Sequence, residues 1–388
     1  MVLKYLLILL IATLSLGQFA RFGNYYIFDL AAAIFAFSGL IFLLIKKRFS
    51  LPKYSILFLI FFVWAAASFF VNIYKYESSE IYISLAYLLR LGVYIFAAIV
   101  VYNLLNLNYL KGRLLEKTLI LSALFLCAAS ALQLVFLPDF SVLDPSLGWD
   151  PHKSRAAGTF FDPNFLGAYL ATVLVWILYR ISAGNKQRIY IYSAATISIF
   201  IFLTFSRSAW AMTAVIIFMF GIFRYPKFLL LGIFIAFLAY FLVPRVQTRI
   251  SGITDPADSA RFRLVSWQNA LEISKDNLLT GVGFNSYRYA QKEYGFLNID
   301  NISSRSGAGS DSSFLFVLAT TGIFGAIIYS VAWFFPFFDN LLSKNKRRLI
   351  LISLIPALIV EASFINSLFY PQIMFVLFVT LFSSTLDI

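Results

Sequence analysis

Residues 54–73 read YSILFLIFFVWAAASFFVNI, a stretch without a single charged side chain. About 20 apolar residues cross a bilayer as a helix, because lipid offers no hydrogen-bonding partner to an open backbone. This stretch therefore predicts a transmembrane helix. The whole 388-residue chain has the same character, since 61% of it is hydrophobic and only 13% is charged. A soluble domain carries roughly 25% charged residues, so the composition predicts a polytopic membrane protein.

Eleven further apolar segments give a total of about twelve candidate transmembrane helices. They are residues 4–20, 27–45, 81–102, 117–137, 164–181, 189–205, 208–223, 228–244, 313–336, 349–367 and 371–386. We interpret the first segment as an uncleaved helix rather than a signal peptide, because its removal would leave an odd number of spans. The predicted fold is all-α, a single integral membrane domain over residues 1–388.

The distribution of Lys and Arg predicts the orientation. With the N-terminus inside, the predicted inner segments hold more than half of the 31 basic residues, as the positive-inside rule requires of cytoplasmic loops. Both termini are therefore expected to be cytoplasmic. The net charge of +13 follows from this topology, and we expect no nucleic-acid partner.

Two predicted outer loops are long, residues 138–163 and residues 245–312 between the ninth and tenth helices. Long ordered loops are usually functional. Residues 259–276 of the larger loop predict an amphipathic helix whose apolar face holds Leu264, Trp267 and Leu271. Asp255–Asp258 gives a start signal for it, and the Ser/Gly-rich stretch 301–310 ends the loop.

Several kinds of chemistry are excluded by the residues themselves. A single histidine, His152, and a single cysteine, Cys127, cannot build a zinc or haem site or a Cys/His pair. The chain also has no phosphate loop and no dinucleotide-binding fingerprint. We therefore expect no metal and no cofactor, and look for function in the Arg, Asp, Glu and Asn side chains near the outer face.

Arginines at the predicted outer face are the first candidates. Arg207 lies in the short turn TFSRSAW (204–210), Arg263 lies four residues before Trp267 with Arg261 beside it, and Arg155 precedes the sixth helix. An arginine can grip a diphosphate through two parallel charge-assisted hydrogen bonds. The alternative is that these arginines only reach towards lipid headgroups or nearby acids.

Asp311 is the second candidate, in the stretch SDSSF (310–314) that leads into the tenth helix. Asp is a favoured helix N-cap, so the carboxylate could cap this helix. It could equally serve as a general base at the outer face, and the two roles are compatible.

Charges inside the predicted spans form a third set. Arg90, Glu361 and Asp29 are functional candidates, because an unpaired charge inside a membrane is costly. The alternative is an internal Arg90–Glu361 ion pair that fixes helix packing. Weaker signals come from polar and aromatic loop residues, namely Asn164, His152, Tyr287, Tyr289 and Tyr294.

Four stretches carry a resemblance to known proteins: TFSRSAW (204–210), RLVSW (263–267) with LLTGVG (278–283), Asp311-Ser312 followed by GIFG (322–325), and more softly GTFFDPN (158–164). In their order and predicted topology they resemble the O-antigen ligase and O-antigen polymerase (Wzy-type) family of bacterial membrane glycosyltransferases. Ligases of this family have a histidine at the position of Asp311. Because His152 lies in a different loop, the resemblance favours a polymerase.

The resemblance implies inverting, metal-independent polymerisation of undecaprenyl-diphosphate-linked oligosaccharide repeat units, such as O-antigen for lipopolysaccharide, at the outer face of the bacterial cytoplasmic (inner) membrane. Arg207 and Arg263 would neutralise the diphosphate leaving group, with Arg155 and Arg261 as second choices. Asp311 would accept a proton from the acceptor hydroxyl.

The implied partners are the lipid-linked glycan donor, a glycan acceptor, the bilayer, and a chain-length regulator or flippase. Two alternatives stay open. One is a ligase that moves finished polymer to a lipid or protein. The other is a secondary transporter or lipid flippase that uses Arg90 and Glu361, although such proteins typically show two similar halves and broken helices, and the sequence shows neither.

Overall fold

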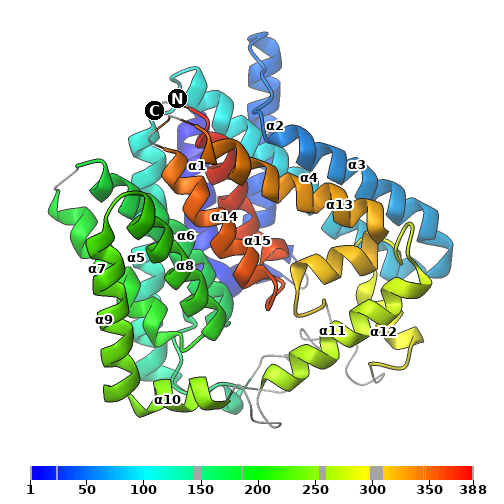
Figure 1. The fold of residues 1–388 in the computed structure, drawn as a ribbon. Helices are drawn as coiled ribbons and strands as arrows, with labels where there is room; N and C mark the ends of the chain where they lie inside the picture. Colours follow the sequence, from blue (N-terminus) through cyan, green and yellow to red (C-terminus); the bar gives the residue numbers. More distant parts are fainter. Residues whose placement is uncertain are drawn as a thin grey trace.

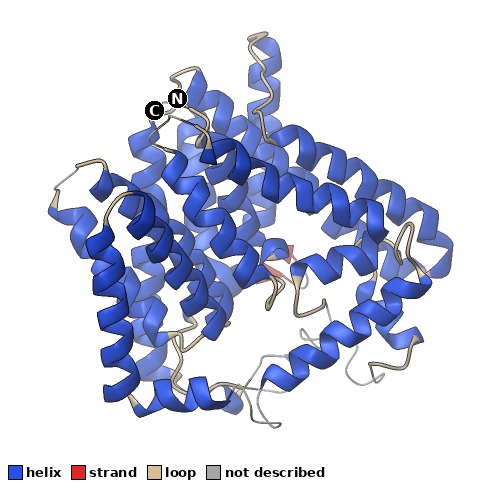
Figure 2. Cartoon of the chain, in the orientation of Figure 1, coloured by secondary structure: helices blue, strands red, loops and turns tan. Residues whose placement is uncertain are grey.

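The computed structural model describes residues 2–22, 25–143, 151–184, 187–252, 259–297, 309–343, 345 and 347–386. This part of the chain is all-helical except for a two-stranded hairpin of β1 (Arg21–Phe22) and β2 (Tyr25–Tyr26) (Figure 2). The predicted start signal at Asp255–Asp258 and most of the Ser/Gly-rich stretch 301–310 lie outside the described residues.

Each of the twelve apolar segments coincides with one helix. These helices are α1 (Val2–Leu16), α2 (Ile27–Ile45), α3 (Ser55–Asn72), α4 (Ser78–Asn106), α5 (Gly112–Phe136), α6 (Pro163–Ser182), α7 (Arg188–Leu203), α8 (Arg207–Phe223), α9 (Pro226–Leu242), α13 (Ser313–Leu341), α14 (Arg348–Ala362) and α15 (Pro371–Ser383). The other three, α10 (Pro244–Ser251), α11 (Ser259–Asp276) and α12 (Tyr287–Glu293), occupy the predicted large outer loop.

Seven of the described helices are long and apolar enough to cross a membrane, namely α1 to α6 and α13. The pair α9 and α10, bent by 96°, supplies an eighth candidate, and α7, α8 and α15 are apolar but shorter. The protein is therefore a multi-pass membrane protein, while the count of twelve spans stays a prediction. The start of α1 and the end of α15 lie at one end of the bundle, and α10, α11 and α12 lie at the other (Figure 1).

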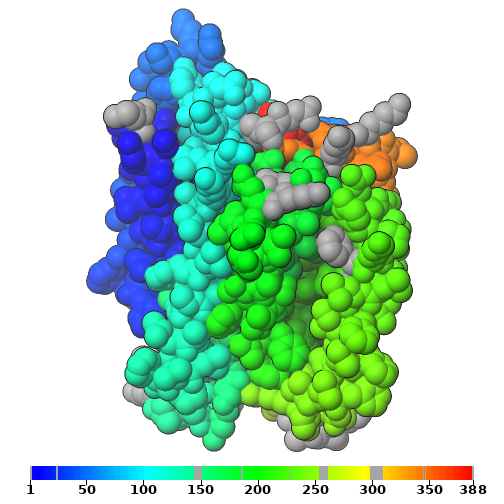
Figure 3. All heavy atoms as spheres, turned by 90° about the vertical axis from the view of Figure 1, so that its left-hand side faces the viewer, coloured from blue at the N-terminus to red at the C-terminus, as the bar shows by residue number. Residues whose placement is uncertain are grey.

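The core of the bundle is built around α6, α14 and α15. Every residue of α15 is buried, where it packs against α4 and α6. A helix that is apolar all round is expected in such a central position. By contrast, α9 has no buried residue among those described and lies at the edge. Figure 3 shows α1 in dark blue, α5 in cyan and the green helices that follow as neighbouring columns on one face.

The packing face of α11 differs from the prediction. Leu264 and Leu271 are exposed, whereas Ala270 and Ile273 are fully buried. The helix packs on α13 through a face that includes the small residue Ala270, because a small side chain allows the two backbones to approach closely. Trp267, from the predicted face, is half-buried.

Candidate functional site

Asn164 joins two arginine-bearing turns at the α10–α12 end of the bundle. Its Oδ1 accepts a hydrogen bond of 2.7 Å from Ser206 Oγ and one of 3.3 Å from Arg155 Nη2. Arg155 also donates through Nε to the carbonyl of Thr204 at 2.7 Å. Ser206 caps α8, and Arg207 is the first residue of that helix. The predicted candidates Arg155, Asn164 and Arg207 therefore belong to one connected unit.

Two further arginines, which the sequence analysis missed, belong to the same unit. Arg249 donates through Nε and Nη2 to the carbonyl of Phe205, both at 3.1 Å, and its own carbonyl accepts a 3.2 Å bond from Arg207 Nη1. Arg245 lies over the Phe205 ring at 4.2 Å and donates to the carbonyl of Ser154 at 2.7 Å. Arg245 and Arg249 are four residues apart, and residues at this spacing share one face of a helix. This spacing was the feature of the sequence that could have identified them as a pair.

A face of α11 holds the third part of the site. Arg263, Ser266 and Trp267 are spaced by three and four residues and so share one face of that helix. Ser266 Oγ accepts a hydrogen bond of 2.9 Å from the backbone N–H of Asp311, and Trp267 Nε1 donates to the carbonyl of Asp311 at 3.2 Å. The main chain of Asp311 is thus held one helical turn from Arg263.

Backbone contacts between the glycine motifs keep α11 and α13 in this arrangement. The N–H groups of Val282 and Gly283 donate to the carbonyls of Ala319 and Thr320, at 2.9 and 3.0 Å. Gly322, at φ +68° and ψ −172°, breaks α13. A Cβ on Gly322 would lie 2.2 Å from the carbonyl oxygen of Leu279. The glycines of both family-like stretches are therefore required for the close approach of two backbones.

Asp311 does not cap α13, which corrects one of its two predicted roles. The N-cap is Ser312, whose hydroxyl accepts a hydrogen bond of 3.4 Å from the backbone N–H of Leu315. Asp311 itself is half-buried. Tyr287 of α12 lies nearby, and burial, together with the negative charge of Asp311, raises the pKa of the Tyr287 hydroxyl. This hydroxyl therefore stays protonated beside the Asp311 carboxylate.

The site carries a strong positive field. The pKa of the Arg155 guanidinium is lowered to about 9, chiefly by burial, and neighbouring positive charges act in the same direction, those of Arg249, Arg245 and Arg263. Asp162, the N-cap of α6, opposes them. A cation whose charged form is disfavoured by its neighbours indicates a place where an anion is stabilised.

Glu361 borders the site and does not pair with Arg90. It is fully buried at the end of α14, interacts electrostatically with Asp162 and Arg263, and accepts a hydrogen bond from Ser367 Oγ. The predicted Arg90–Glu361 ion pair is therefore wrong.

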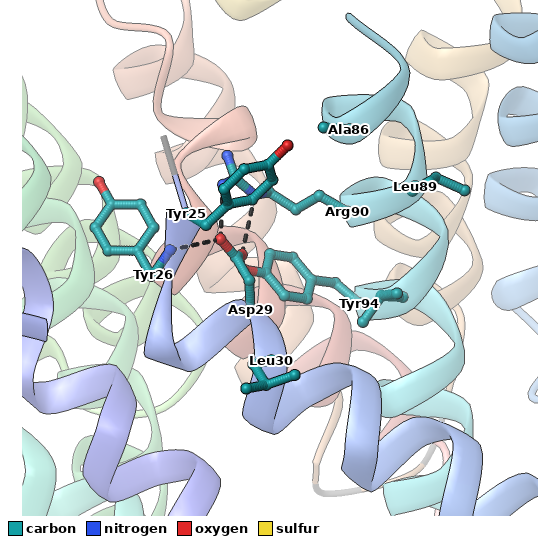
Figure 4. A pocket seen from close by; sticks show the side chains of 9 residues that line it. Tyr25, Tyr26, Asp29, Leu30, Ala86, Leu89, Arg90 and Tyr94 are labelled. Carbon is teal, nitrogen blue, oxygen red and sulfur yellow. Dashed lines mark hydrogen bonds and ion pairs between the residues drawn. The ribbon is translucent and has the colours of Figure 1, made fainter. Parts of the chain in front are cut away.

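Arg90 forms an ion pair with Asp29, and the two lie in a separate cleft of about 430 Å³ between α2 and α4 (Figure 4). Arg90 Nε donates to Asp29 Oδ1 at 2.9 Å, and Nη2 donates to Oδ2 at 2.6 Å. Tyr94 also donates to Asp29, and the ring of Tyr87 lies 4.4 Å from the guanidinium. Both intramembrane charges are thus balanced within the cleft.

Two further candidates, Arg261 and His152, take no part in the hydrogen bonds described above. Arg261 is exposed and, two residues before Arg263, points about 200° around α11 from it. His152 is buried with its ring centroid 4.0 Å from that of Phe140. Burial, and to a smaller extent the charge of Arg155, lowers the pKa of His152 to about 4. The imidazole is therefore neutral at neutral pH and packs as an aromatic ring.

Comparison with known proteins gives one family. Residues 192–330 match the family model described as O-antigen ligase, a range that contains Arg207, Arg263 and Asp311 together with the glycine motifs. None of the curated proteins that were compared matches the chain. The family match confirms the resemblance inferred from the motifs. It supports an enzyme of the O-antigen ligase or polymerase type, which acts on a lipid-linked glycan in a membrane.

Proposed function

We propose that the protein polymerises undecaprenyl-diphosphate-linked oligosaccharide repeat units at the outer face of the cytoplasmic membrane. The observation that carries the proposal is the gathering of arginines from four segments around one end of the bundle. Arg155, Arg249, Arg245 and Arg263 interact electrostatically, and Arg207 is hydrogen-bonded to the backbone of Arg249. Asp311 is tied to the same face of α11 as Arg263.

The arginines fit a diphosphate leaving group. In the proposed reaction the bond between the anomeric carbon of the donor and the diphosphate oxygen breaks, and negative charge grows on that oxygen. Cationic groups that are already in place stabilise this charge without having to reorganise, which is usually the largest catalytic effect. Arg207 and Arg263 would bind the diphosphate, and the half-buried Arg155 would add to the positive charge around it. Arg261 is the weakest of the four candidates because it is exposed on the other side of α11.

Asp311 fits the proton acceptor. The oxygen of an acceptor-sugar hydroxyl attacks the anomeric carbon from the face opposite the diphosphate, and its proton passes to the carboxylate of Asp311. A single direct displacement inverts the anomeric centre. The N-cap of α13 is Ser312 and not Asp311, and Tyr287, protonated nearby, can donate a hydrogen bond to a sugar oxygen.

A ligase is the second candidate, and the family match fits it as well as it fits a polymerase. The two reactions share the donor and differ in the acceptor, which is another lipid-linked glycan for a polymerase and a different lipid or a protein for a ligase. A transporter pathway through Arg90 and Glu361 has less support, because Arg90 is paired with Asp29. A chain-length regulator or a flippase remains a proposed partner of the polymerase.

The deciding experiment gives the purified full chain an undecaprenyl-diphosphate-linked repeat unit and follows the products by size. A ladder of products that lengthens with time is the expected result. Arg263→Lys should abolish most of the ladder, because a lysine loses the bidentate geometry of arginine. Arg261→Lys is the matched control, with the same substitution on the exposed side of the same helix, and it should extend glycan as the wild type does.

A single transfer to an added lipid acceptor, with no ladder, would favour the ligase. Equal activity of the Arg263→Lys and Arg261→Lys variants would remove the diphosphate role of Arg263.

A further inference from the structure

A cleft of about 360 Å³ opens at the end of the bundle opposite the arginine site. It is formed by the beginning of α1, the turn between α4 and α5, and the beginning of α5. The N-terminus of the chain is marked at this end of the bundle in Figure 1. Four cationic side chains line it, those of Lys4, Lys111, Arg113 and Lys117, together with Asn108 and Tyr109. The cationic side chains are exposed and so accessible to a ligand.

The positive charge of the cleft is not balanced within the described part of the chain. None of the four ion pairs found there includes Lys4, Lys111, Arg113 or Lys117. Glu116 is the one acidic residue of α5. It is buried, and its carboxylate pairs at 2.6 Å with Arg180 of α6 instead.

Two of the three helices whose ends lie at the cleft, α1 and α5, add to its positive potential. α1 and α5 are neighbours that both begin at the cleft. Neither has an acidic residue in its first turn, and Lys111, the N-cap of α5, makes no capping hydrogen bond. The N-terminus of a helix carries about half a positive charge and favours anions. Cations placed at two helix N-termini are repelled by the positive ends of the two helix dipoles. An anion bound between the two N-termini would relieve this repulsion.

The requirement that cytoplasmic loops be basic does not by itself explain why the four cations of the cleft lie where they do. Lys46, Lys47 and Arg48 follow the C-terminus of α2 at the same end of the bundle, where the helix dipole attracts cations. They satisfy the topology rule at no electrostatic cost. The four cations of the cleft have such compensation only from the C-terminus of α4, which is opposed by the N-termini of α1 and α5.

An apolar track continues from the cleft along α5. Arg113, Lys117, Leu121 and Phe125 follow one another at intervals of four residues, so they lie along one face of the helix. Leu121 is 64% exposed and Phe125 is 47% exposed. A ligand that has an anionic head in the cleft and a hydrocarbon chain below it would cover both parts of this face.

We infer that this cleft binds the phosphate-bearing headgroup of an anionic phospholipid from the adjacent leaflet, which is the predicted cytoplasmic one. Basic pockets between transmembrane helices on that side suit such headgroups. The acyl chain would lie along Leu121 and Phe125. The inference concerns the end of the bundle away from the arginine site and does not depend on the proposed polymerase activity.

The test is a titration of the purified full chain with phosphatidylglycerol and, separately, with phosphatidylcholine, and bound lipid is counted by native mass spectrometry. The variant is Lys111→Gln/Arg113→Gln/Lys117→Gln. The matched control is Lys46→Gln/Lys47→Gln/Arg48→Gln, which removes the same charge from the end of α2. Each cation near an anionic lipid strengthens binding about fivefold, so the cleft variant should bind phosphatidylglycerol about a hundredfold more weakly, and the control should change far less.

Three results would overturn the inference: equal losses in the two triple variants, phosphatidylcholine binding as tightly as phosphatidylglycerol, or displacement of the lipid by an equal concentration of soluble glycerol phosphate. The last would mean that the cleft takes a free phosphate. If the triple variant does not insert, Lys117→Gln alone decides the matter, with an expected loss of about fivefold.

Discussion

Replacing Gly322 with alanine tests how the segments that carry Arg263 and Asp311 are held together. The residue sits at φ +68° and ψ −172°, a region that is essentially restricted to glycine, and the backbone strain there costs about 1–3 kcal/mol. The added Cβ would also lie 2.2 Å from the carbonyl oxygen of Leu279, so one of the two backbones must move.

Such a movement strains three hydrogen bonds between the segments, Val282 to Ala319 at 2.9 Å, Gly283 to Thr320 at 3.0 Å and Ile323 to Leu278 at 2.8 Å. Each contributes about 0.5–1.5 kcal/mol. The free energy of unfolding should therefore fall by about 3–7 kcal/mol in total, which is at the upper end of the effects of single substitutions.

Gly184→Ala is the matched control. Gly184 also has a positive φ, +88°, but nothing lies within 4 Å of the position of its Cβ, so this variant adds the strain without the collision. The assay is the apparent melting temperature of each purified variant, followed by tryptophan fluorescence in detergent. Gly322→Ala should melt well below Gly184→Ala and lose glycan extension, since Arg263 and Asp311 lie on the two segments that separate. Equal melting temperatures would refute the account of the glycine motifs.

Three further predictions concern single side chains. Asp311→Asn should melt like the wild type and lose on the order of 10²–10⁴ in the rate of glycan extension, because a base is removed and no cap is lost. Ser312→Ala should lower the free energy of unfolding by about 0.5–2 kcal/mol, because Ser312 is the cap of α13. If Asp311 capped α13 instead, the Asp311 variant would lose stability and the Ser312 variant would not. Arg155→Gln should weaken donor binding, because it removes one of the cations gathered at the site that would stabilise the diphosphate, and the dissociation constant of the donor, compared with that of the wild type, checks this. Asp29→Asn should lower the melting temperature more than Asp139→Asn does. The first substitution leaves the buried Arg90 without its ionic partner, whereas Asp139 pairs with the exposed Lys153.

The helices could be predicted from the sequence because each depends on a local run of apolar residues. The bounds of α2 were predicted as residues 27–45, and the helix is Ile27–Ile45. The neighbours of each helix could not be predicted in the same way. An Arg90–Glu361 pair was one of two open interpretations, but α4 packs against α2, which places Asp29 beside Arg90. Which helices touch is decided by the packing of the whole bundle and leaves no signal in either segment alone.

The site shows the same division between local and long-range information. The arginines of the short turns could be recognised because Arg207 and Arg263 lie in distinctive stretches. Arg245 and Arg249 lay in the predicted outer loop but were missed because they belong to no distinctive stretch, and nothing in the sequence indicated that a helix, α10, follows α9 there at a 96° bend. The face of α11 was also misassigned, since periodicity finds apolar residues but not the backbone contact that buries Ala270. The cap was misassigned by one residue, because Asp311 and Ser312 are equally good caps by type.

The affinity of the purified protein for undecaprenyl diphosphate, compared between Arg263→Gln and Arg261→Gln, tests the central claim most directly, because it isolates diphosphate binding from the later steps. A charge-assisted hydrogen bond is worth about 1.5–3 kcal/mol, so Arg263→Gln should weaken binding by about 10- to 100-fold. Arg261→Gln, which removes the same charge from the exposed side of α11, should bind nearly as tightly as the wild type. Equal dissociation constants for the two variants would contradict the assignment of the arginine cluster as the diphosphate site.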